Sequence, residues 1–474
     1  MRTIPAWSAH MGRGWISCPL RRRSSRPRRP FFRPLREVAS RARQAPTGFT
    51  STAARHPLFA DFPLMHARQP PGRRATDWRP RRCRQSARFK MKRELFSAVS
   101  ALALLPCVAP LQAAEPDGER LETLTIEALP LQDVSAAESV QPAKVVAGEE
   151  LIKQRDRSLG RSLSSEPGIS SADFGIGVGR PVVRGLSGPR VRVQENGLSA
   201  ADVSTLSVDH AVSIDTLTAR QIEVLKGPAT LLYGSGAIGG VVNVVTDRIP
   251  RSAPTRVGGE IDFSVNDSTV GGAATALSLT GGLGDFAWRL HGDTRQTGDY
   301  QADGDQRLDN SATETDTSGA GGSWSGSRGY LGAAVASHAS TYGIPGEEAQ
   351  IDLSQDRIDL AGELYEPFPY FERLKVSAAH TDYLHTEGEA GIPEVFFDNE
   401  EAEVRVELNH APAGGWRGAL GLQATDRQFE AFGEEEVFVP PTDTRSAALF
   451  AVEEYSFGNG LDNAGRFPRR AAGA

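Results

Sequence analysis

Hydrophobic and polar residues alternate with a period of two along most of the second half of the chain. The alternation is clearest in three segments, residues 286–293, 404–409 and 416–423. Alternation of this kind is typical of β-strands that present one apolar face and one polar face. We expect about ten such strands, and they begin near residues 257, 272, 286, 315, 330, 355, 373, 402, 416 and 444.

The connections between the expected strands vary in length, and short turns alternate with longer segments. A soluble β-sandwich also alternates, but the polar inner face, together with the signal peptide and the preceding domain described below, favours a barrel in lipid, which has an apolar outside and no unpaired sheet edge. The longer connections are expected at residues 301–314, 343–354, 386–401 and 433–444. The last two are rich in Asp and Glu, which either concentrates cations near the protein or only keeps surface loops solvated.

A glycine-rich stretch, residues 220–246, precedes these strands. Ile222–Leu225 predicts a buried strand, Gly227–Pro228 breaks it, and the β-branched run Val241–Val245 predicts a second strand. Residues Gly234–Gly239 also match G-x-G-x-x-G, which binds dinucleotides when a helix follows the motif. A short valine-rich run follows instead, so a nucleotide-binding enzyme is the less favoured hypothesis.

This stretch belongs to an α+β domain that we place at residues 145–250. We expect an amphipathic helix at Glu149–Leu163 and short strands at Pro181–Arg184 and Val191–Glu195. Three arginines lie in or beside these strands: Arg184, Arg190 and Arg192. One interpretation is that they are catalytic or bind phosphate. The other, which we expect, is that they pair with acids on the inner wall of the barrel.

The first ninety residues differ in composition from the rest of the chain. Residues 1–90 hold 22 basic and three acidic residues, frequent proline and no persistent apolar period. A basic arm for nucleic acid is one interpretation. We favour another, that this sequence lies upstream of the true start at Met91 and is not translated, and we expect no nucleic-acid partner.

Residues 91–114 have the pattern of a secretory signal peptide. A basic start at Lys92 and Arg93 precedes an apolar run, and small residues near Ala113 and Ala114 suit cleavage. From Met91 onward the chain carries 31 basic and 56 acidic residues, so the exported part is acidic. All three cysteines precede the expected cleavage point, which excludes a disulfide framework and a thiolate metal site after it.

A polar linker follows at residues 115–144. Within it, residues 121–128 read L-E-T-L-T-I-E-A and alternate between polar and apolar side chains. Such a segment near a flexible terminus either adds as a strand to the sheet edge of a partner or remains an ordinary solvated linker.

The glycine-rich stretch resembles the plug domain of TonB-dependent outer-membrane receptors. The resembling motifs are I-E-V-L-K-G-P at 222–228, L-L-Y-G at 231–234, G-A-I-G-G-V-V-N-V-V-T at 236–246, P-G-I at 167–169, P-V-V-R-G at 181–185 and R-V-R-V at 190–193. The resemblance implies a plug domain followed by a transmembrane β-barrel, active uptake without covalent chemistry, and location in the outer membrane with its lipid around the barrel.

The resemblance also implies a partner and the segment that binds it. The linker segment resembles a TonB box, the strand by which such receptors engage TonB in the periplasm. Its residues are Glu122, Thr123, Leu124, Thr125, Ile126, Glu127 and Ala128. No cofactor is expected, because a metal would be cargo.

Within the family, the chain resembles zinc-uptake receptors. The motifs are S-V-D-H-A at 207–211, F-E-R-L-K-V at 371–376, D-Y-L-H-T-E at 382–387, F-F-D-N at 396–399 and V-R-V-E-L-N-H at 404–410. The resemblance implies four metal ligands: Asp209, His210, His385 and Glu387. Carboxylate oxygens and imidazole nitrogens suit Zn²⁺. A hydrogen-bonded loop pair at Asp209 and His210 remains the alternative, and siderophore, corrinoid or other metal-chelate cargo remains open.

The family resemblance implies about 22 barrel strands, whereas we expect about ten, in residues 251–459. Residues 460–474 lose the alternation and return to the Arg, Pro, Ala and Gly composition of residues 1–90. These two observations predict an incomplete barrel with an aberrant tail, and a fragment that does not work as a receptor by itself.

Overall fold

The computed structural model describes residues 125–131, 143–265, 270–302, 306–433 and 436–455. The expected arm at 1–90, the signal peptide at 91–114 and the tail at 460–474 lie outside these residues, as do Glu122, Thr123 and Leu124 of the expected TonB box. Within the described ranges, none of the helices has the length and apolarity needed to cross a membrane.

A small mixed domain comes first in the chain. Its helices are α2 (Gly148–Gln154), α3 (Leu159–Ser162) and the 3₁₀ turns η1 (Gly188–Arg190), η2 (Thr216–Thr218), η3 (Pro228–Tyr233) and η4 (Ser235–Ala237). Its strands are β1 (Ala143–Ala147), β2 (Ile169–Phe174), β3 (Val178–Val183), β4 (Val191–Glu195), β5 (Leu198–Ser199), β6 (Gln221–Leu225) and β7 (Gly240–Val245). We call this domain the plug.

Five plug strands form one sheet in the order β1-β6-β7-β4-β5, and β2 pairs with β3 separately. Every residue of β7 is buried, as expected for a β-branched strand in the middle of a sheet with both faces covered. The glycine-rich turn lets the chain return closely to this sheet. A Cβ on Gly239 would lie 3.0 Å from the carbonyl oxygen of Arg190, so only glycine fits there without displacement.

The helix expected over residues 149–163 is wrong in its extent, because the chain forms two short helices. Helix α2 ends before Arg155, and α3 begins after Ser158, whose side chain accepts a hydrogen bond from the Arg161 N–H. Between them, the carbonyl of Asp156 accepts hydrogen bonds from Thr216 Oγ1 and from Arg295 Nη1, at 3.1 and 3.0 Å. These tertiary contacts use a carbonyl that a continuous helix would have bonded internally.

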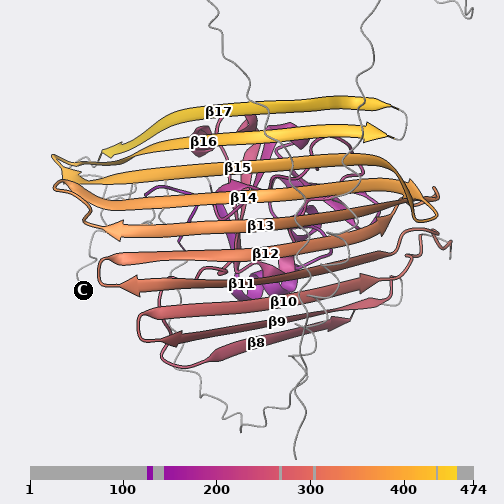
Figure 1. The fold of residues 1–474 in the computed structure, drawn as a ribbon, viewed down its shortest axis with the longest axis horizontal. Coiled ribbons are helices and arrows are strands. Elements are labelled where there is room, and N and C mark those ends of the chain that lie inside the picture. Colours follow the sequence, from indigo (N-terminus) through magenta and orange to yellow (C-terminus); the bar gives the residue numbers. More distant parts are fainter. Residues whose placement is uncertain (1–124, 132–142, 266–269, 303–305, 434–435, 456–474) are drawn as a thin grey trace, which may run out of the picture. The chain divides into compact units, whose positions relative to one another are not determined.

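Ten antiparallel strands follow the plug. They are β8 (Gly258–Val265), β9 (Gly272–Leu283), β10 (Phe286–Thr297), β11 (Thr313–Gly326), β12 (Gly329–Gly343), β13 (Ala349–Tyr365), β14 (Phe371–Glu389), β15 (Ile392–Ala413), β16 (Trp416–Gly433) and β17 (Val437–Tyr455). Each strand pairs with its neighbours in the chain, so the sheet runs in sequence order from β8 to β17 (Figure 1). We call this sheet the wall.

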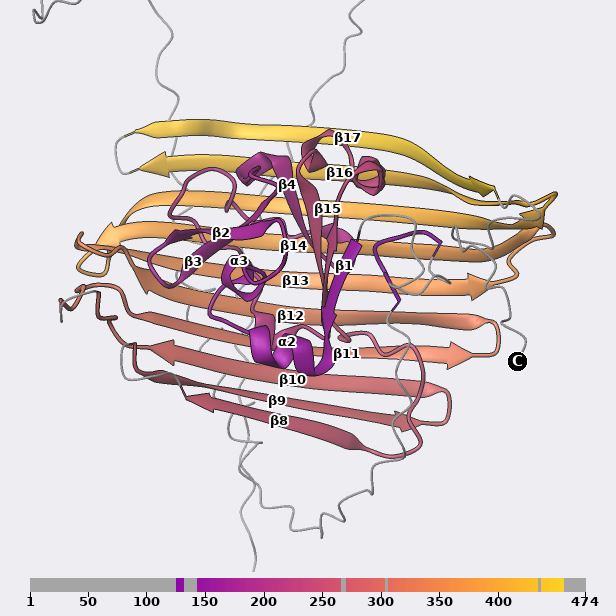
Figure 2. The ribbon, with the colours of Figure 1, turned by 180° about the vertical axis from the view of Figure 1, so that it is seen from behind.

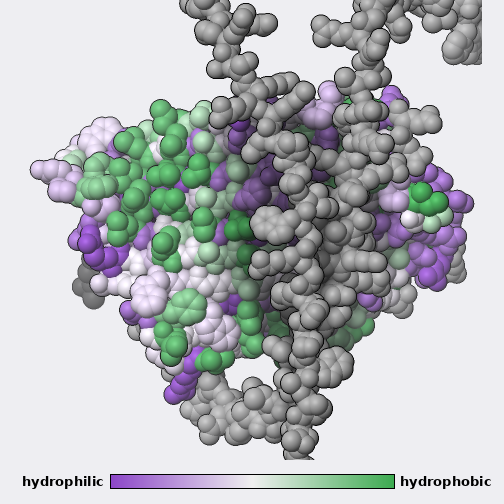
Figure 3. Space-filling view, in the orientation of Figure 1, coloured by the Kyte–Doolittle hydropathy of each residue, from purple (hydrophilic) through white to green (hydrophobic). Residues whose placement is uncertain are grey.

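The wall confirms the expected alternation. Leu290 on β10 is exposed on the outer face, whereas its neighbours Arg289 and His291 point toward the plug, with His291 in a half-buried position. Apolar residues gather over part of the outer face (Figure 3). The plug lies against the other, polar face, as seen from behind (Figure 2). This arrangement gives the plug polar partners and leaves apolar residues on the opposite face, as expected for a barrel in lipid.

Several outer connections are shorter than expected. The segment at residues 386–401 was expected to be a loop, but β14 and β15 continue through it and leave a turn of two residues, Ala390 and Gly391. Both have positive φ, 51° and 77°, which matches the turn that suits a tight hairpin. Likewise β17 begins at Val437, inside the expected loop at 433–444. The acidic residues at positions 387, 389, 394, 398, 400, 401 and 403 therefore lie on strands β14 and β15.

Wall side chains reach the plug by donating hydrogen bonds to its backbone carbonyls. The pairs and donor–acceptor distances are Arg357 Nη1 to Ser199 (2.8 Å), Gln355 Nε2 to Ala200 (2.8 Å), Asn399 Nδ2 to Ala201 (2.8 Å), Arg405 Nη1 to Leu232 (3.0 Å) and Arg295 Nη1 to Asp156 (3.0 Å). The donors lie on strands β10, β13 and β15, and the acceptors lie at positions between residues 156 and 232 of the plug.

Ion pairs join the plug and the wall as well, and they test the expectation for the three plug arginines. Arg192 pairs with Glu403 of β15 at 3.0 Å, which confirms that expectation for this residue. Arg184 and Arg190 have exposed side chains instead. Arg248 at the end of the plug pairs with Glu195, and Arg357 of β13 lies 3.6 Å from the same carboxylate.

Candidate metal centre

The plug loop that carries Asp209 and His210 follows β5 and is tied at both of its ends. The carboxylate of Asp202 accepts hydrogen bonds from the backbone N–H groups of Ser204 and Ser213, at 3.0 and 3.1 Å. Arg180 on β3 donates to the carbonyl oxygens of Ser204 and Ser207, both at 2.8 Å. These bonds fix a segment without regular secondary structure and hold His210 against the wall.

The wall contributes His385 and Glu387 from β14. Two residues apart on one strand, they project from the same face of the sheet, which here is the inner face. His385 lies opposite Phe397 of β15 in the strand register. The long hairpin of β14 and β15 therefore carries one side of the centre.

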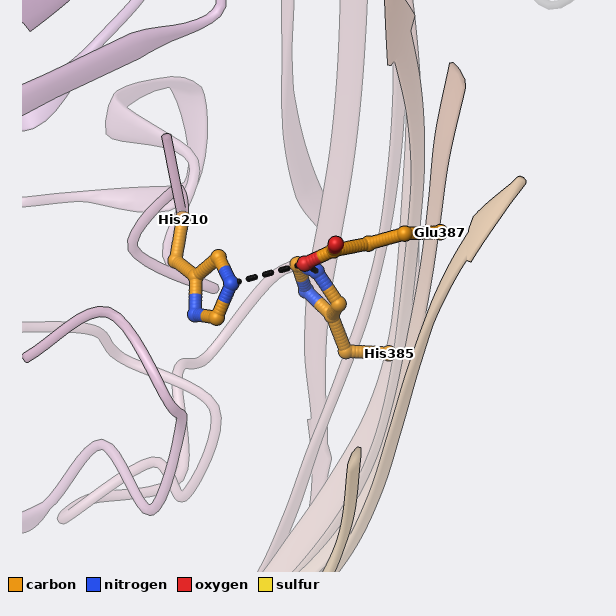
Figure 4. A group of neighbouring side chains, drawn as sticks. All are labelled: His210, His385 and Glu387. Atoms are coloured by element: carbon orange, nitrogen blue, oxygen red, sulfur yellow. Dashed lines mark hydrogen bonds and ion pairs between the residues drawn. The ribbon is translucent and has the colours of Figure 1, made fainter. Parts of the chain in front are cut away.

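The three side chains converge on a single carboxylate oxygen. His210 Nε2 lies 2.9 Å from Glu387 Oε1, and His385 Nε2 lies 3.2 Å from the same oxygen (Figure 4). The two imidazole rings have centroids 4.3 Å apart. Their nitrogens and the carboxylate oxygen form a group of ligand-type atoms within 4.8 Å of one another.

The opposite ring nitrogen of each histidine has its own hydrogen-bond partner. His210 Nδ1 lies 3.0 Å from the carbonyl oxygen of Val203, which requires that Nδ1 donates the hydrogen bond. His385 Nδ1 lies 3.2 Å from the hydroxyl of Tyr383. Such partners orient imidazoles and select the nitrogen that remains for a metal, in this case Nε2. Phe397 packs edge-on against both rings.

The charge state of His210 follows from these contacts. Burial by itself would lower the pKa of His210. The hydrogen bonds to Glu387 and to the Val203 carbonyl, together with the nearby negative charges, outweigh burial and raise the pKa above its ordinary value. Without a metal, His210 therefore keeps its proton, and the positive charge opposite Glu387, to a higher pH than a free imidazole does.

The structure brings together three of the four expected ligands. Asp209 is not part of the group, because its carboxylate accepts a hydrogen bond from Ser207 Oγ in its own loop. Its carbonyl accepts a hydrogen bond of 3.0 Å from the Tyr342 hydroxyl. The sequence interpretation missed Val203, Tyr383 and Phe397. Of these, Tyr383 had a signal, since it shares the inner face with His385 at a spacing of two.

The geometry suits a transition-metal ion with nitrogen and oxygen ligands. Zinc binds histidine nitrogens and carboxylate oxygens at about 2.0–2.2 Å, so two ligand atoms around a tetrahedral ion lie about 3.3 Å apart. The spacings of 2.9 and 3.2 Å between the histidine nitrogens and Glu387 Oε1 are close to that value. These two spacings therefore fit ligation of one ion by Glu387 together with either histidine, and the three ligand atoms all lie within 4.8 Å of one another.

The nucleotide-binding hypothesis is wrong, because the structure lacks the helix that must follow the glycine-rich motif. Residues Gly234–Gly239 are followed directly by strand β7 rather than a helix. In addition, β7 runs antiparallel to the preceding strand β6, so no β-α-β unit surrounds the motif.

Comparison with known proteins agrees with this fold. Residues 135–241 match the family model described as TonB-dependent Receptor Plug Domain. The chain is 30% identical over 198 residues to the vitamin B12 transporter BtuB of Photobacterium profundum, which covers 40% of this chain and 30% of that protein. It is 29% identical over 185 residues to a hemin receptor of Yersinia pestis, which covers 37% and 27%.

Solved structures show the same architecture. The copper transporter OprC superimposes with a TM-score of 0.57 at 16% identity, covering 66% of this chain and 52% of that one. The siderophore receptor PirA of Pseudomonas aeruginosa superimposes with a TM-score of 0.52 at 17% identity, covering 67% and 54%. The chain thus spans about half the length of these structures and less than a third of the curated relatives above.

Fold, site and matches together define a plug domain joined to the strands of an outer-membrane barrel. The chain contains a domain that matches the plug domain of TonB-dependent receptors, and this domain is followed by ten antiparallel strands whose fold is similar to that of the copper transporter and the siderophore receptor. The proteins matched here are receptors and transporters, in agreement with the expectation that the chain is not an enzyme.

Proposed function

We propose that this receptor takes up a metal ion across the outer membrane, with zinc as its cargo and TonB as its periplasmic partner. The observation that carries the proposal is the convergence of His210, His385 and Glu387 on one point between plug and wall. Two imidazole nitrogens and one carboxylate oxygen form a donor set that suits Zn²⁺. The acidic ends of the wall strands support it, since they concentrate cations near the mouth.

Burial of the centre favours a bare ion over a large chelate. The side chains of His210 and His385 are 1% and 0% exposed, and that of Glu387 is 24% exposed. Phe397 packs against both imidazole rings and leaves the carboxylate as the accessible member. A corrinoid or siderophore would have to displace these groups to reach the nitrogens, whereas a small ion has only to replace a proton.

The alternative is a siderophore or corrinoid receptor of the same family. Sequence similarity to the vitamin B12 transporter favours it, but that similarity covers 30% of the transporter. In that case His210 and Glu387 act only as an ion pair that holds the plug loop to the wall. The two hypotheses therefore differ in whether the centre binds metal in the absence of any chelator.

The site lies where ligand binding can change the contact between plug and wall. His210 belongs to the plug, whereas His385 and Glu387 belong to β14. An ion shared by the three ligands stabilises the joined arrangement and shifts the population of plug conformers toward it. TonB then engages the box near the plug terminus by β-strand addition and supplies the energy for transport.

Calorimetric titration of the detergent-solubilised protein with zinc chloride tests the proposal. We expect a dissociation constant of about a micromolar or tighter, and His210→Ala should weaken binding at least about tenfold, or about 1.4 kcal/mol. Thr386→Ala is the matched control, because Thr386 lies between His385 and Glu387 on the strand but points to the opposite face. It should bind zinc as the unmodified protein does.

Equal zinc affinity in the unmodified protein and His210→Ala would remove the centre from the binding site. Absence of zinc binding, together with binding of cyanocobalamin or a ferric siderophore, would favour the alternative receptor.

A further inference from the structure

The backbone on both sides of His210 bonds to a single side chain of the wall. The hydroxyl of Tyr342 on β12 donates a hydrogen bond to the carbonyl oxygen of Asp209 at 3.0 Å and accepts one from the N–H group of Ala211 at 3.0 Å. A phenol hydroxyl has one proton to donate and lone pairs with which to accept, so one group makes both bonds. The residues before and after His210 are therefore held at the same point of the wall.

The ring of Tyr342 is packed between plug and wall. It is 2% exposed and belongs to an apolar cluster with Val178 of β3, Ala211, Ile344 and Ile351. Close packing restricts the ring to one position, so its hydroxyl has a fixed direction. A buried N–H or carbonyl group that loses its partner is costly, which favours the bonded loop over an open one.

Strand register places Tyr342 at a defined distance from Glu387. Tyr342 lies opposite Ile351 of β13, and Ile351 lies opposite Glu387 of β14. The hydroxyl and the carboxylate therefore project from one row of the wall, two strands apart, which is about 10 Å in a β-sheet. The buried side chain of Ile351 lies between them.

His210 is the plug residue that spans this distance. Its neighbours in the chain bond to Tyr342, and its Nε2 lies 2.9 Å from Glu387 Oε1 (Figure 4). The spacing of the strands is set by their backbone hydrogen bonds, so the wall fixes both the backbone and the tip of this residue. A ligand held in this way has little conformational freedom left to lose when it binds an ion.

We propose that Tyr342 is a positioning residue for the metal centre. Its hydroxyl fixes the backbone of His210 so that Nε2 meets Glu387 and His385, and this preorganisation sets the affinity for the ion and its coordination geometry. The proposal rests on the proposed function, since it requires that the centre binds a metal. The two hydrogen bonds themselves belong to the metal-free chain and are measurable without an ion.

A conservative substitution separates the hydroxyl from the ring. Tyr342→Phe keeps the ring in its apolar cluster, whereas the carbonyl of Asp209 and the N–H group of Ala211 lose their partner. Tyr330→Phe is the matched control, because Tyr330 is a buried tyrosine of the same strand and, at an even spacing, of the same face. It lies at the opposite end of β12, about 40 Å along the strand from Tyr342.

Amide hydrogen exchange of the metal-free full chain in detergent, resolved by mass spectrometry, is the first measurement. In Tyr342→Phe we expect peptides covering residues 209–213 to exchange about tenfold faster, since the amide of Ala211 loses its acceptor. Peptides covering β7 should keep their protection, which shows that the plug remains folded. Tyr330→Phe should leave residues 209–213 as protected as in the unmodified protein. Unchanged exchange of residues 209–213 in a folded Tyr342→Phe protein would overturn the proposal.

The second measurement is calorimetric titration of the same proteins with zinc chloride. We expect Tyr342→Phe to bind zinc about tenfold more weakly, because His210 must then be ordered when the ion binds. Tyr330→Phe should bind zinc as the unmodified protein does.

The third measurement is the visible absorption of cobalt(II) bound at the centre, which reports the number and arrangement of the ligands. At saturating cobalt we expect Tyr342→Phe to differ from the unmodified protein in absorption per bound ion, because Nε2 of His210 is no longer held in place. A variant that only unfolds more easily would bind fewer ions but keep the spectrum of each bound ion.

The outcomes distinguish this proposal from the proposed function. Faster exchange of residues 209–213 with unchanged zinc affinity and cobalt spectrum would overturn the positioning role and leave Tyr342 as a contact between plug and wall. Absence of zinc and cobalt binding in the unmodified protein would refute the proposed function, and the metal role of Tyr342 with it, even where exchange confirms the two hydrogen bonds.

Discussion

His210 Nε2 lies 2.9 Å from Glu387 Oε1, and this contact joins residues that are 177 positions apart in the chain. One side chain belongs to a plug loop and the other to β14 of the wall. Because His385 reaches the same oxygen, the contact is both an ion pair and the centre of a potential metal site. A change in protonation or metal binding at this contact therefore also changes how firmly the plug is held to the wall.

Substitution of Glu387 and of Asp209 should show which of the two carboxylates binds zinc and which only lies near the site. Glu387→Gln should weaken zinc binding at least about tenfold, since it removes the charged ligand from the group. Asp209→Asn should change the affinity less than about twofold, because the Asp209 carboxylate bonds within its own loop. Zinc calorimetry of both variants measures the difference. The opposite ranking would show that Asp209 is a ligand and that the loop rearranges on binding.

Zinc affinity should fall as the pH is lowered from 8 to 6. Zinc binds the neutral imidazole, and because the pKa of His210 is raised, a proton competes with zinc there up to a higher pH than at a free imidazole. In the protein without metal, the stability of the fold changes with pH in the opposite direction to zinc affinity. The ion pair stabilises the fold below the ordinary pKa of histidine, and its contribution is lost as the pH rises through the raised value.

Calorimetry in two buffers with different ionisation enthalpies measures the protons released on zinc binding. An affinity that does not change between pH 8 and pH 6, with no proton release, would contradict the assignment of His210 as a protonated ligand.

Substitution of Asp202 should lower zinc affinity although Asp202 is not one of the metal ligands. Asp202→Ala removes the acceptor that bonds the N–H groups of Ser204 and Ser213 at the two ends of the His210 loop. We expect zinc affinity to fall about fivefold, since the loop then has to be ordered on binding. Hydrogen exchange across residues 203–211 should rise in parallel. Asp173→Ala, in β2, is the control and should change neither quantity.

Arg357 should be important for stability rather than for binding. It lies buried between Asp359 Oδ1 at 2.8 Å and Glu195 Oε2 at 3.6 Å, and it donates to the carbonyl of Ser199. Arg357→Met leaves two buried carboxylates without this partner and should destabilise the protein by about 3–5 kcal/mol. Thermal unfolding in detergent measures it. Arg445→Met removes an exposed ion pair and should have little effect, and an equal loss in both variants would contradict the argument.

The strands of the wall were predictable from the sequence because the two faces of the wall lie in different environments, and this difference sets the alternation of apolar and polar residues. Lipid outside and polar contacts inside place apolar and polar residues at every second position, as at Leu290 and Arg289. The same argument explains the errors at residues 386–401 and 433–444. Beyond the lipid both faces of a strand meet water, so the period of two disappears although the backbone pairing continues. The acidic hairpin of β14 and β15 therefore resembled a loop.

The site was predictable in part for a similar reason. His385 and Glu387 share a strand, so their common face follows from a spacing of two. The approach of His210 depends on a plug loop fixed by Asp202 and Arg180, and no local pattern encodes that contact. The segment 125–128, part of the predicted TonB box, also follows a local pattern, but its backbone contacts with Glu223 join residues that are 95 and 96 positions apart in the chain. Long-range packing decided both cases.

The bonds from wall side chains to plug carbonyls have a consequence for how the plug moves. A carbonyl oxygen occurs at every residue, and water replaces a broken hydrogen bond at little cost wherever it gains access. Gln355 and Asn399 are therefore able to release Ala200 and Ala201 and to bond the next carbonyl that arrives, whereas Arg357 is also held by the carboxylates of Glu195 and Asp359. Hydrogen bonds to carbonyl groups therefore resist sliding of the plug along the wall only weakly. Ion pairs such as Arg192 with Glu403 hold the plug more firmly.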